Sequence, residues 1–216
     1  MKKLIYLPLI ELVTHYPDIA AVLQKHHIDT QEYHHTTLSH VLQSTRFFRA
    51  ELMTDVTNAI IASACAQYKT ENVKQLTCEI VKNFHNPHRA QMYGLISDAN
   101  DVEQKYAEHH RYPVGLHALL IDFFDDLSRH MEQEEQFLFP SLITAGEFHL
   151  FPQLLVASHS HDRHIKMMAK INSMTDYFAA PSDASIEWQE LYENLLEFVL
   201  QLNMHIAIEN QFLLDD

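Results

Sequence analysis

The stretch that decides the fold reads LYENLLEFVLQLNMHIAIENQF and spans residues 191–212. Its apolar positions recur at alternating spacings of four and three residues, which predicts one buried seam along an amphipathic helix. The seam positions are Leu191, Leu195, Phe198, Leu202, His205, Glu209 and Phe212. A histidine and a glutamate therefore interrupt an otherwise apolar seam. Because a buried carboxylate is costly without a partner, this pair predicts a specific interaction in the core.

The same arrangement occurs earlier in the chain. A second seam consists of Leu116, Leu120, Phe123, Leu127, His130, Glu134 and Phe137. Two further segments each carry a pair of histidines three residues apart, His85 with His88 and His161 with His164. His130 follows His85 by 45 residues, and His205 follows His161 by 44. This internal repeat predicts two helical hairpins that share one site of approximate twofold symmetry.

The predicted fold is all-α, a four-helix bundle with a short amino-terminal helical appendage. Only 3 glycines occur in the chain, so few tight turns can form. The breaks between the long helices contain Pro113-Val114-Gly115, Gly146 and Pro181-Ser182-Asp183. The helices are expected near residues 71–99, 114–144, 148–176 and 185–213. Three parts are therefore predicted: an appendage of two or three short helices (1–48), a helical connection (49–70) and the bundle (71–216).

The composition limits which binding partners and which cellular compartment are expected. The net charge is −14, and an acidic surface repels phosphate backbones, so nucleic-acid binding is not expected. No stretch reaches the roughly 20 apolar residues of a membrane span. Cys65 and Cys78 form no zinc-type motif, and residues 1–11 lack the features of a cleaved signal. These features predict a cytoplasmic protein with reduced thiols.

Histidine is unusually frequent: 17 His exceed the 15 Lys and Arg, which indicates metal binding, proton transfer or pH sensing. A His and a Glu four residues apart share one helix face, so each such pair can reach the same site. Two pairs with one His from each other helix give the predicted metal ligands His85, His130, Glu134, His161, His205 and Glu209. Imidazole nitrogens with bridging carboxylates suit iron. The expected cofactor is a pair of Fe ions with open positions for an oxo or hydroxo bridge and a small diatomic ligand.

Residues next to these ligands allow several interpretations. His88 and His164 are hydrogen-bond partners of ligands, alternative ligands or half-buried histidines. Glu132, Glu135 and Asn210 fall off the ligand face by their spacing, and Glu135 is expected in solvent or beside a ligand. Other chemistries fit less well, because no HExxH zinc motif is present and the order His-x-x-x-Glu differs from the Glu-x-x-His of ferritin-like proteins. Iron storage, reversible ligand binding and a purely structural bundle remain as alternatives.

Two motifs carry a resemblance to a known family. HMEQEEQFLFP (residues 130–140) and HIAIENQFL (residues 205–213) are similar to the metal motifs of hemerythrin-like proteins, and their order resembles the bacterial repair-of-iron-centres proteins. The resemblance implies a di-iron site on the six residues above, with Glu134 and Glu209 bridging. It also implies repair of iron–sulfur clusters after nitrosative or oxidative damage, with damaged iron–sulfur proteins as clients. An O2- or NO-binding protein without turnover is the alternative, and the residues decide neither catalysis nor oligomeric state.

The chain departs from the family pattern at two places. Members usually carry a Cys-Cys pair in the appendage, where Gln31 and Glu32 stand here, so the resemblance implies no thiol chemistry for this segment. The second motif lacks the Phe-Pro that closes the first, which predicts that the fourth helix ends early. Pro87 is also expected to bend the first helix beside the site.

Overall fold

The computed structural model describes residues 3–29, 35–45, 48–68, 72–144 and 151–214, with only the backbone described for residues 151–155. Within these ranges every regular element is a helix, which confirms the all-α fold class. Gln31, Glu32 and Gly146 lie outside the described residues. Contacts divide the chain into two compact units, Met1–Tyr68 with Thr175–Ala207, and Lys69–Met174 with Ile208–Asp216. The predicted parts 1–48, 49–70 and 71–216 stay a prediction.

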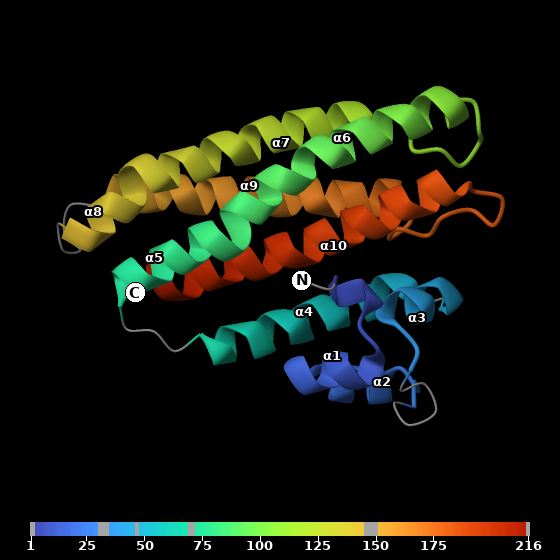
Figure 1. The fold of residues 1–216 in the computed structure, drawn as a ribbon, viewed down its shortest axis with the longest axis horizontal. Coiled ribbons are helices and arrows are strands. Elements are labelled where there is room, and N and C mark those ends of the chain that lie inside the picture. Colours follow the sequence, from blue (N-terminus) through green and yellow to red (C-terminus); the bar gives the residue numbers. More distant parts are fainter. Residues whose placement is uncertain (1–2, 30–34, 46–47, 69–71, 145–150, 215–216) are drawn as a thin grey trace. The chain divides into compact units, whose positions relative to one another are not determined.

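The second unit is built from long helical segments (Figure 1). They are α5 (Val73–Ile80), η2 (Val81–His85) and α6 (Asn86–Tyr106); α7 (Leu116–Gln133), η3 (Glu134–Leu138) and α8 (Phe139–Thr144); α9 (Phe151–Met174); and η5 (Asn210–Leu214). Helix α6 lies beside α7, and α7 lies beside α9. Gly115 precedes α7 with a φ of 87°, a conformation that glycine adopts without a steric penalty, which explains the predicted break there.

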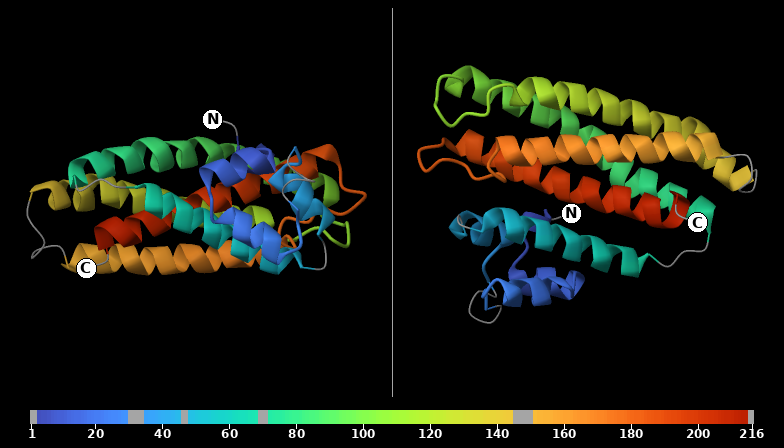
Figure 2. Two further views of the ribbon diagram at one scale, coloured as in Figure 1. Left: turned by 90° about the horizontal axis from the view of Figure 1, so that it is seen from below. Right: turned by 180° about the vertical axis from the view of Figure 1, so that it is seen from behind.

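The first unit combines short helices with most of α10. Its elements are η1 (Leu4–Tyr6), α1 (Leu9–His15), α2 (Ile19–Lys25), α3 (Leu38–Ser44), α4 (Arg49–Gln67) and α10 (Ile186–Glu209), which continues into the second unit. The short blue helices lie against α4 in Figures 1 and 2, through contacts between α2 and α4. The buried Trp188 packs edge-on against Tyr192, with their ring centroids 6.1 Å apart. No helix in the described part of the chain has the length and apolar character needed to cross a membrane.

One buried carboxylate fixes the beginning of the chain in the first unit. Glu197 is 2% exposed and accepts hydrogen bonds from the backbone N–H of Ile5 at 3.1 Å and from Gln201 Nε2 at 2.6 Å. The neighbouring Glu193 accepts hydrogen bonds from Tyr6 and Ser39. The acceptor on Glu197 thus satisfies a backbone donor that the fold removes from water.

Replacing Glu197 by leucine is expected to destabilise the protein by about 1–3 kcal/mol, because the buried N–H of Ile5 then lacks its acceptor. Urea unfolding followed by circular dichroism measures this loss. Glu197→Gln keeps an acceptor oxygen of the same size and should retain more stability than Glu197→Leu. Equal unfolding midpoints for the two variants would show that this hydrogen bond contributes nothing.

Most positions of the two predicted seams are confirmed. Each seam differs from the prediction at its last position. Leu191, Leu195, Leu116 and Leu120 are fully buried. Phe137, however, is 60% exposed, and the buried position there is Leu138. In the other copy Phe212 is half-buried and Leu213 takes the buried position. The prediction was wrong at these two phenylalanines because a π-helical turn follows each glutamate and moves the seam on by one residue.

Candidate metal centre

Three π-helical turns adjoin the predicted ligands. Segment η2 ends at His85, η3 begins at Glu134, and η5 begins directly after Glu209. The N–H of Asn86 donates to the carbonyl of Val81, and the N–H of Phe139 donates to the carbonyl of Glu134, each five residues back. Such turns inside α-helices occur frequently at functional sites.

Two prolines explain two of these turns. Pro87 and Pro140 each stand two residues after the end of a π-helical turn. A proline has no N–H, so the carbonyl four residues earlier cannot receive its α-helical hydrogen bond. Widening the preceding turn lets the chain continue as one helix past the proline. The predicted bend at Pro87 is thus a local change of helical hydrogen bonding beside His85.

The structure buries all six predicted ligands and brings five of them together within the second unit. His85, His130, Glu134, His161, His205 and Glu209 are each between 0 and 4% exposed. His130, Glu134, His161 and Glu209 each offer one ligand atom, and these atoms lie within 4.8 Å of one another. His205 stands on α10, four residues before Glu209. The spacing argument therefore placed the two groups of each pair correctly on one helix face.

Both glutamates face His85 and His161 through different oxygens, and Glu134 also faces His130. Glu134 Oε1 lies 3.2 Å from His130 Nε2 and 3.8 Å from His161 Nε2, and Glu134 Oε2 lies 3.5 Å from His85 Nε2. Glu209 Oε2 lies 3.2 Å from His161 Nε2, and Glu209 Oε1 lies 3.5 Å from His85 Nε2. Both carboxylates thus present one oxygen to the His85 side and one to the His161 side. These carboxylate oxygens and imidazole nitrogens are placed so that they could hold metal.

The electrostatics of this cluster favour a bound cation. Burial and the negative charges of Glu209 and Glu135 raise the pKa of Glu134 well above its usual range. Glu134 Oε2 makes no hydrogen bond with any residue in the described ranges. Two buried carboxylates that repel each other, one with an oxygen that lacks a hydrogen bond, are stabilised by a positive ion between them. The residues therefore fit a metal.

Polar partners hold the outer nitrogens of two candidate ligand histidines. His85 Nδ1 lies 2.7 Å from Glu135 Oε1, which also accepts a hydrogen bond from Arg89 at 2.8 Å. His161 Nδ1 lies 2.7 Å from Asn210 Oδ1. Asn210 was not expected at the site, although it occupies the same place after Glu209 as Glu135 does after Glu134. That equivalence in the internal repeat was the signal that could have identified it.

The two remaining histidines of the repeat are fully buried. His164 Nε2 lies 3.1 Å from Asp126 Oδ2, and its ring lies edge-on to His130 with their centroids 5.0 Å apart. Burial lowers the pKa of His164 to about 4, against the opposing charge of Asp126. His88 packs beside Phe84, with ring centroids 6.3 Å apart. His164 therefore supports His130 from behind, which favours its interpretation as a neighbour of a ligand over that of a ligand.

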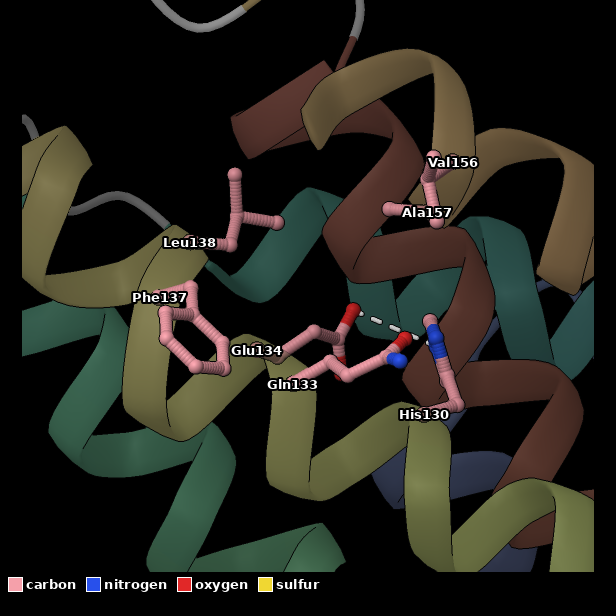
Figure 3. Close-up of a pocket in the computed structure, with 7 residues that line it drawn as sticks. All are labelled: His130, Gln133, Glu134, Phe137, Leu138, Val156 and Ala157. Atoms are coloured by element: carbon pink, nitrogen blue, oxygen red, sulfur yellow. Dashed lines mark ion pairs between the residues drawn. The ribbon is translucent and has the colours of Figure 1, made fainter. Parts of the chain in front are cut away.

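A cavity of about 370 Å³ opens beside this cluster (Figure 3). It is lined by His130, Gln133, Glu134, Phe137, Leu138, Val156 and Ala157. Val156 and Ala157 come from α9, and the other residues come from α7 and η3. The dashed line in Figure 3 joins His130 to Glu134, which form the polar end of a largely apolar cavity. The exposed Phe137, displaced by the π-helical turn, forms part of its wall.

Comparison with known proteins identifies the family of this chain. Residues 77–214 match the family described as the hemerythrin HHE cation binding domain. The chain belongs to the hemerythrin family. Cation binding is the property that this family description names, and the buried histidines and glutamates are groups that could hold a metal cation.

Similarity to individual proteins extends over most of the chain. An iron-sulfur cluster repair protein YtfE from Musicola paradisiaca is 36% identical over 134 residues, which cover 62% of this chain and 60% of the relative. A probable iron-sulfur cluster repair protein from Haemophilus influenzae is 30% identical over 162 residues, 74% of this chain and 72% of the relative. YtfE from an Enterobacter species is 29% identical over 211 residues, 95% of this chain and 94% of the relative. These matches confirm the predicted family resemblance.

Proposed function

We propose that this protein uses a non-haem di-iron centre to repair iron–sulfur clusters damaged by nitrosative or oxidative stress. The observation that carries the proposal is the pair of buried glutamates, each with one oxygen toward His85 and the other toward His161. The names of the relatives supply the process and the class of client, damaged iron–sulfur proteins. The cytoplasm is the proposed compartment, in agreement with the free thiols of Cys65 and Cys78.

Six side chains would hold the iron, namely His85, His130, Glu134, His161, His205 and Glu209. Iron bound there would supply one-electron redox chemistry and coordination of diatomic molecules such as O2 or NO. The protein's own contribution is to keep the imidazoles oriented through Glu135 and Asn210 and to exclude bulk water by burial. Repair would proceed by delivery of iron to the damaged cluster, by handling of nitric oxide, or by both.

Repair activity tests the proposal directly. A cluster enzyme inactivated by nitric oxide is incubated with iron-loaded protein, and its recovered activity is measured against an equal concentration of free ferrous iron. We expect the wild-type protein to restore activity and Glu134→Leu, which lacks one bridging carboxylate, to restore no more than free iron does. Equal recovery with both proteins would contradict the proposed role of the centre.

The apolar cavity favours a second candidate function. A space of about 370 Å³ beside His130 and Glu134 admits a small diatomic molecule next to the proposed iron, as a binding or sensing protein would need. Reversible spectral changes with O2 or NO, with no recovery of a damaged client, would favour sensing over repair. Recovery of the client at a rate that depends on protein concentration would favour repair.

A further inference from the structure

The two imidazoles that face both glutamates differ in their outer partners. His85 Nδ1 donates to a carboxylate, Glu135, whereas His161 Nδ1 donates to a neutral amide, Asn210, and both distances are 2.7 Å. When the Nε2 atom of a histidine binds a metal, its Nδ1 carries the hydrogen and becomes a donor. The two partners therefore accept the same hydrogen bond at the same distance, but only one is charged. Glu135 and Asn210 break the twofold symmetry of the internal repeat at equivalent positions.

A guanidinium holds the carboxylate of Glu135, which forms an ion pair with Arg89. Arg89 Nη1 donates to the same Oε1 atom at 2.8 Å, which fixes the carboxylate in place. The side chains of Arg89 and Glu135 are 29% and 30% exposed, so solvent screens the guanidinium charge more than it screens the direct hydrogen bond to His85.

The outer partner of His161 is the neutral side-chain amide of Asn210. Asp162, the next residue along the chain, is exposed to solvent, which weakens its effect. His130, which also offers a nitrogen on this side, lies edge-on to His161 and His164. A charged acceptor makes an imidazole a stronger electron donor to a metal than a neutral amide does, because the shared proton moves toward the acceptor. A stronger donor stabilises the higher oxidation state.

We propose that Glu135 and Asn210 are positioning residues that make the two metal positions electronically unequal, so that the iron held by His85 is oxidised at a lower potential than the iron held by His161. This inference rests on the proposed di-iron centre. A one-electron acceptor then removes the first electron from the His85 side, and the half-oxidised centre is stable because the second electron requires a stronger oxidant. The unequal positions follow from two side chains outside the ligand set.

The test uses the full chain loaded with two irons and reduced to the diferrous form. Anaerobic titration with ferricyanide, which accepts one electron per molecule, is followed by electron paramagnetic resonance and Mössbauer spectra, and it gives both reduction potentials. Glu135→Gln should raise the lower potential, and Asn210→Asp should lower the higher potential. Each change should reduce the equilibrium constant for forming the half-oxidised state by about tenfold, which corresponds to about 59 mV for one electron.

The two substitutions are nearly isosteric and predict shifts of opposite sign, so each decides the question by itself if the other impairs folding or iron uptake. Glu132→Gln on α7 is the matched control, because Glu132 is exposed, and its potentials should equal those of the wild type. Unchanged potentials in both variants with two irons bound, or shifts in the same direction, would overturn this inference and leave the repair function standing. A wild-type chain that takes up no iron would overturn the proposed function as well, and the metal count separates these outcomes.

Discussion

Replacing Glu134 by leucine is expected to remove metal binding and, at the same time, to stabilise the metal-free protein. The carboxylate is 2% exposed, faces Glu209 across the same cluster and has its pKa raised by burial and by that neighbouring charge. In the metal-free protein this is a cost, because a buried carboxyl group that faces another carboxylate is unfavourable without a compensating cation. With metal present, the same carboxylate would be one of its ligands. Its loss should lower metal affinity by more than the about 10–100-fold that follows loss of a ligand's hydrogen-bond partner.

Metal content by plasma emission spectroscopy and urea unfolding in chelator measure the two effects on the same preparations. Glu132→Leu, an exposed position on the same helix, is the control and should change neither. We expect about two irons per chain in the wild type and fewer than one in Glu134→Leu. A variant that is less stable than the wild type in chelator, or that still binds two irons, would show that Glu134 is an ordinary core residue and no bridging ligand.

Removing the metal from the wild-type protein is expected to lower its melting temperature substantially. A ligand that binds only the folded state stabilises it by about 4 kcal/mol when its free concentration is about 1,000 times the dissociation constant. For a protein of about 150–250 residues, each kcal/mol shifts the melting temperature by about 2–4 °C, so a shift of about 8–16 °C follows. Differential scanning calorimetry of iron-loaded and chelator-treated protein measures this shift.

The Glu134→Leu variant provides the matching control for this second experiment. Because it should hold no metal, its melting temperature should be the same with and without chelator. The melting temperature of the loaded wild type should also rise with free iron concentration, as binding to the folded state requires. Equal melting temperatures for loaded and chelated wild type would mean that the buried cluster contributes no binding energy to the fold.

The sequence predicted the buried positions of the helices well, because the spacing of apolar residues is constant wherever a helix keeps a constant number of residues per turn. Leu116, Leu120, Leu191 and Leu195 lie at the predicted buried positions, and α10 begins within a residue of the predicted start. The pattern failed at Phe137 and Phe212, since periodicity assumes one constant number of residues per turn. Pro87 and Pro140 were visible in the sequence, but a missing N–H predicts a kink or a break equally well. Only the structure shows that the chain responds with a wider turn.

Sequence analysis could identify the candidate ligands for a related reason. A His and a Glu four residues apart share a helix face whatever surrounds them, so spacing alone identifies the pairs. Asn210 could not be found in that way, because its face is set by the π-helical turn that begins at that residue. The cavity beside His130 was inaccessible as well. It depends on Val156 and Ala157 from α9, and no spacing within one helix predicts which side chains of another helix line a space.

The π-helical turns also make the geometry of the site depend on the number of residues in each turn. Each turn contains one residue more than a regular helix needs to maintain its hydrogen bonding, while the helix on both sides keeps its ordinary register. A related sequence with the same histidines and glutamates but one residue fewer between Glu134 and Pro140 would form a continuous α-helix there. The residues beyond the turn would keep their buried and exposed faces, but one side chain of the turn, such as Glu135 or Phe137, would be missing from the site. Insertions and deletions of a single residue at these turns are therefore changes of the site itself, and comparisons within the family should count residues there as well as identify them.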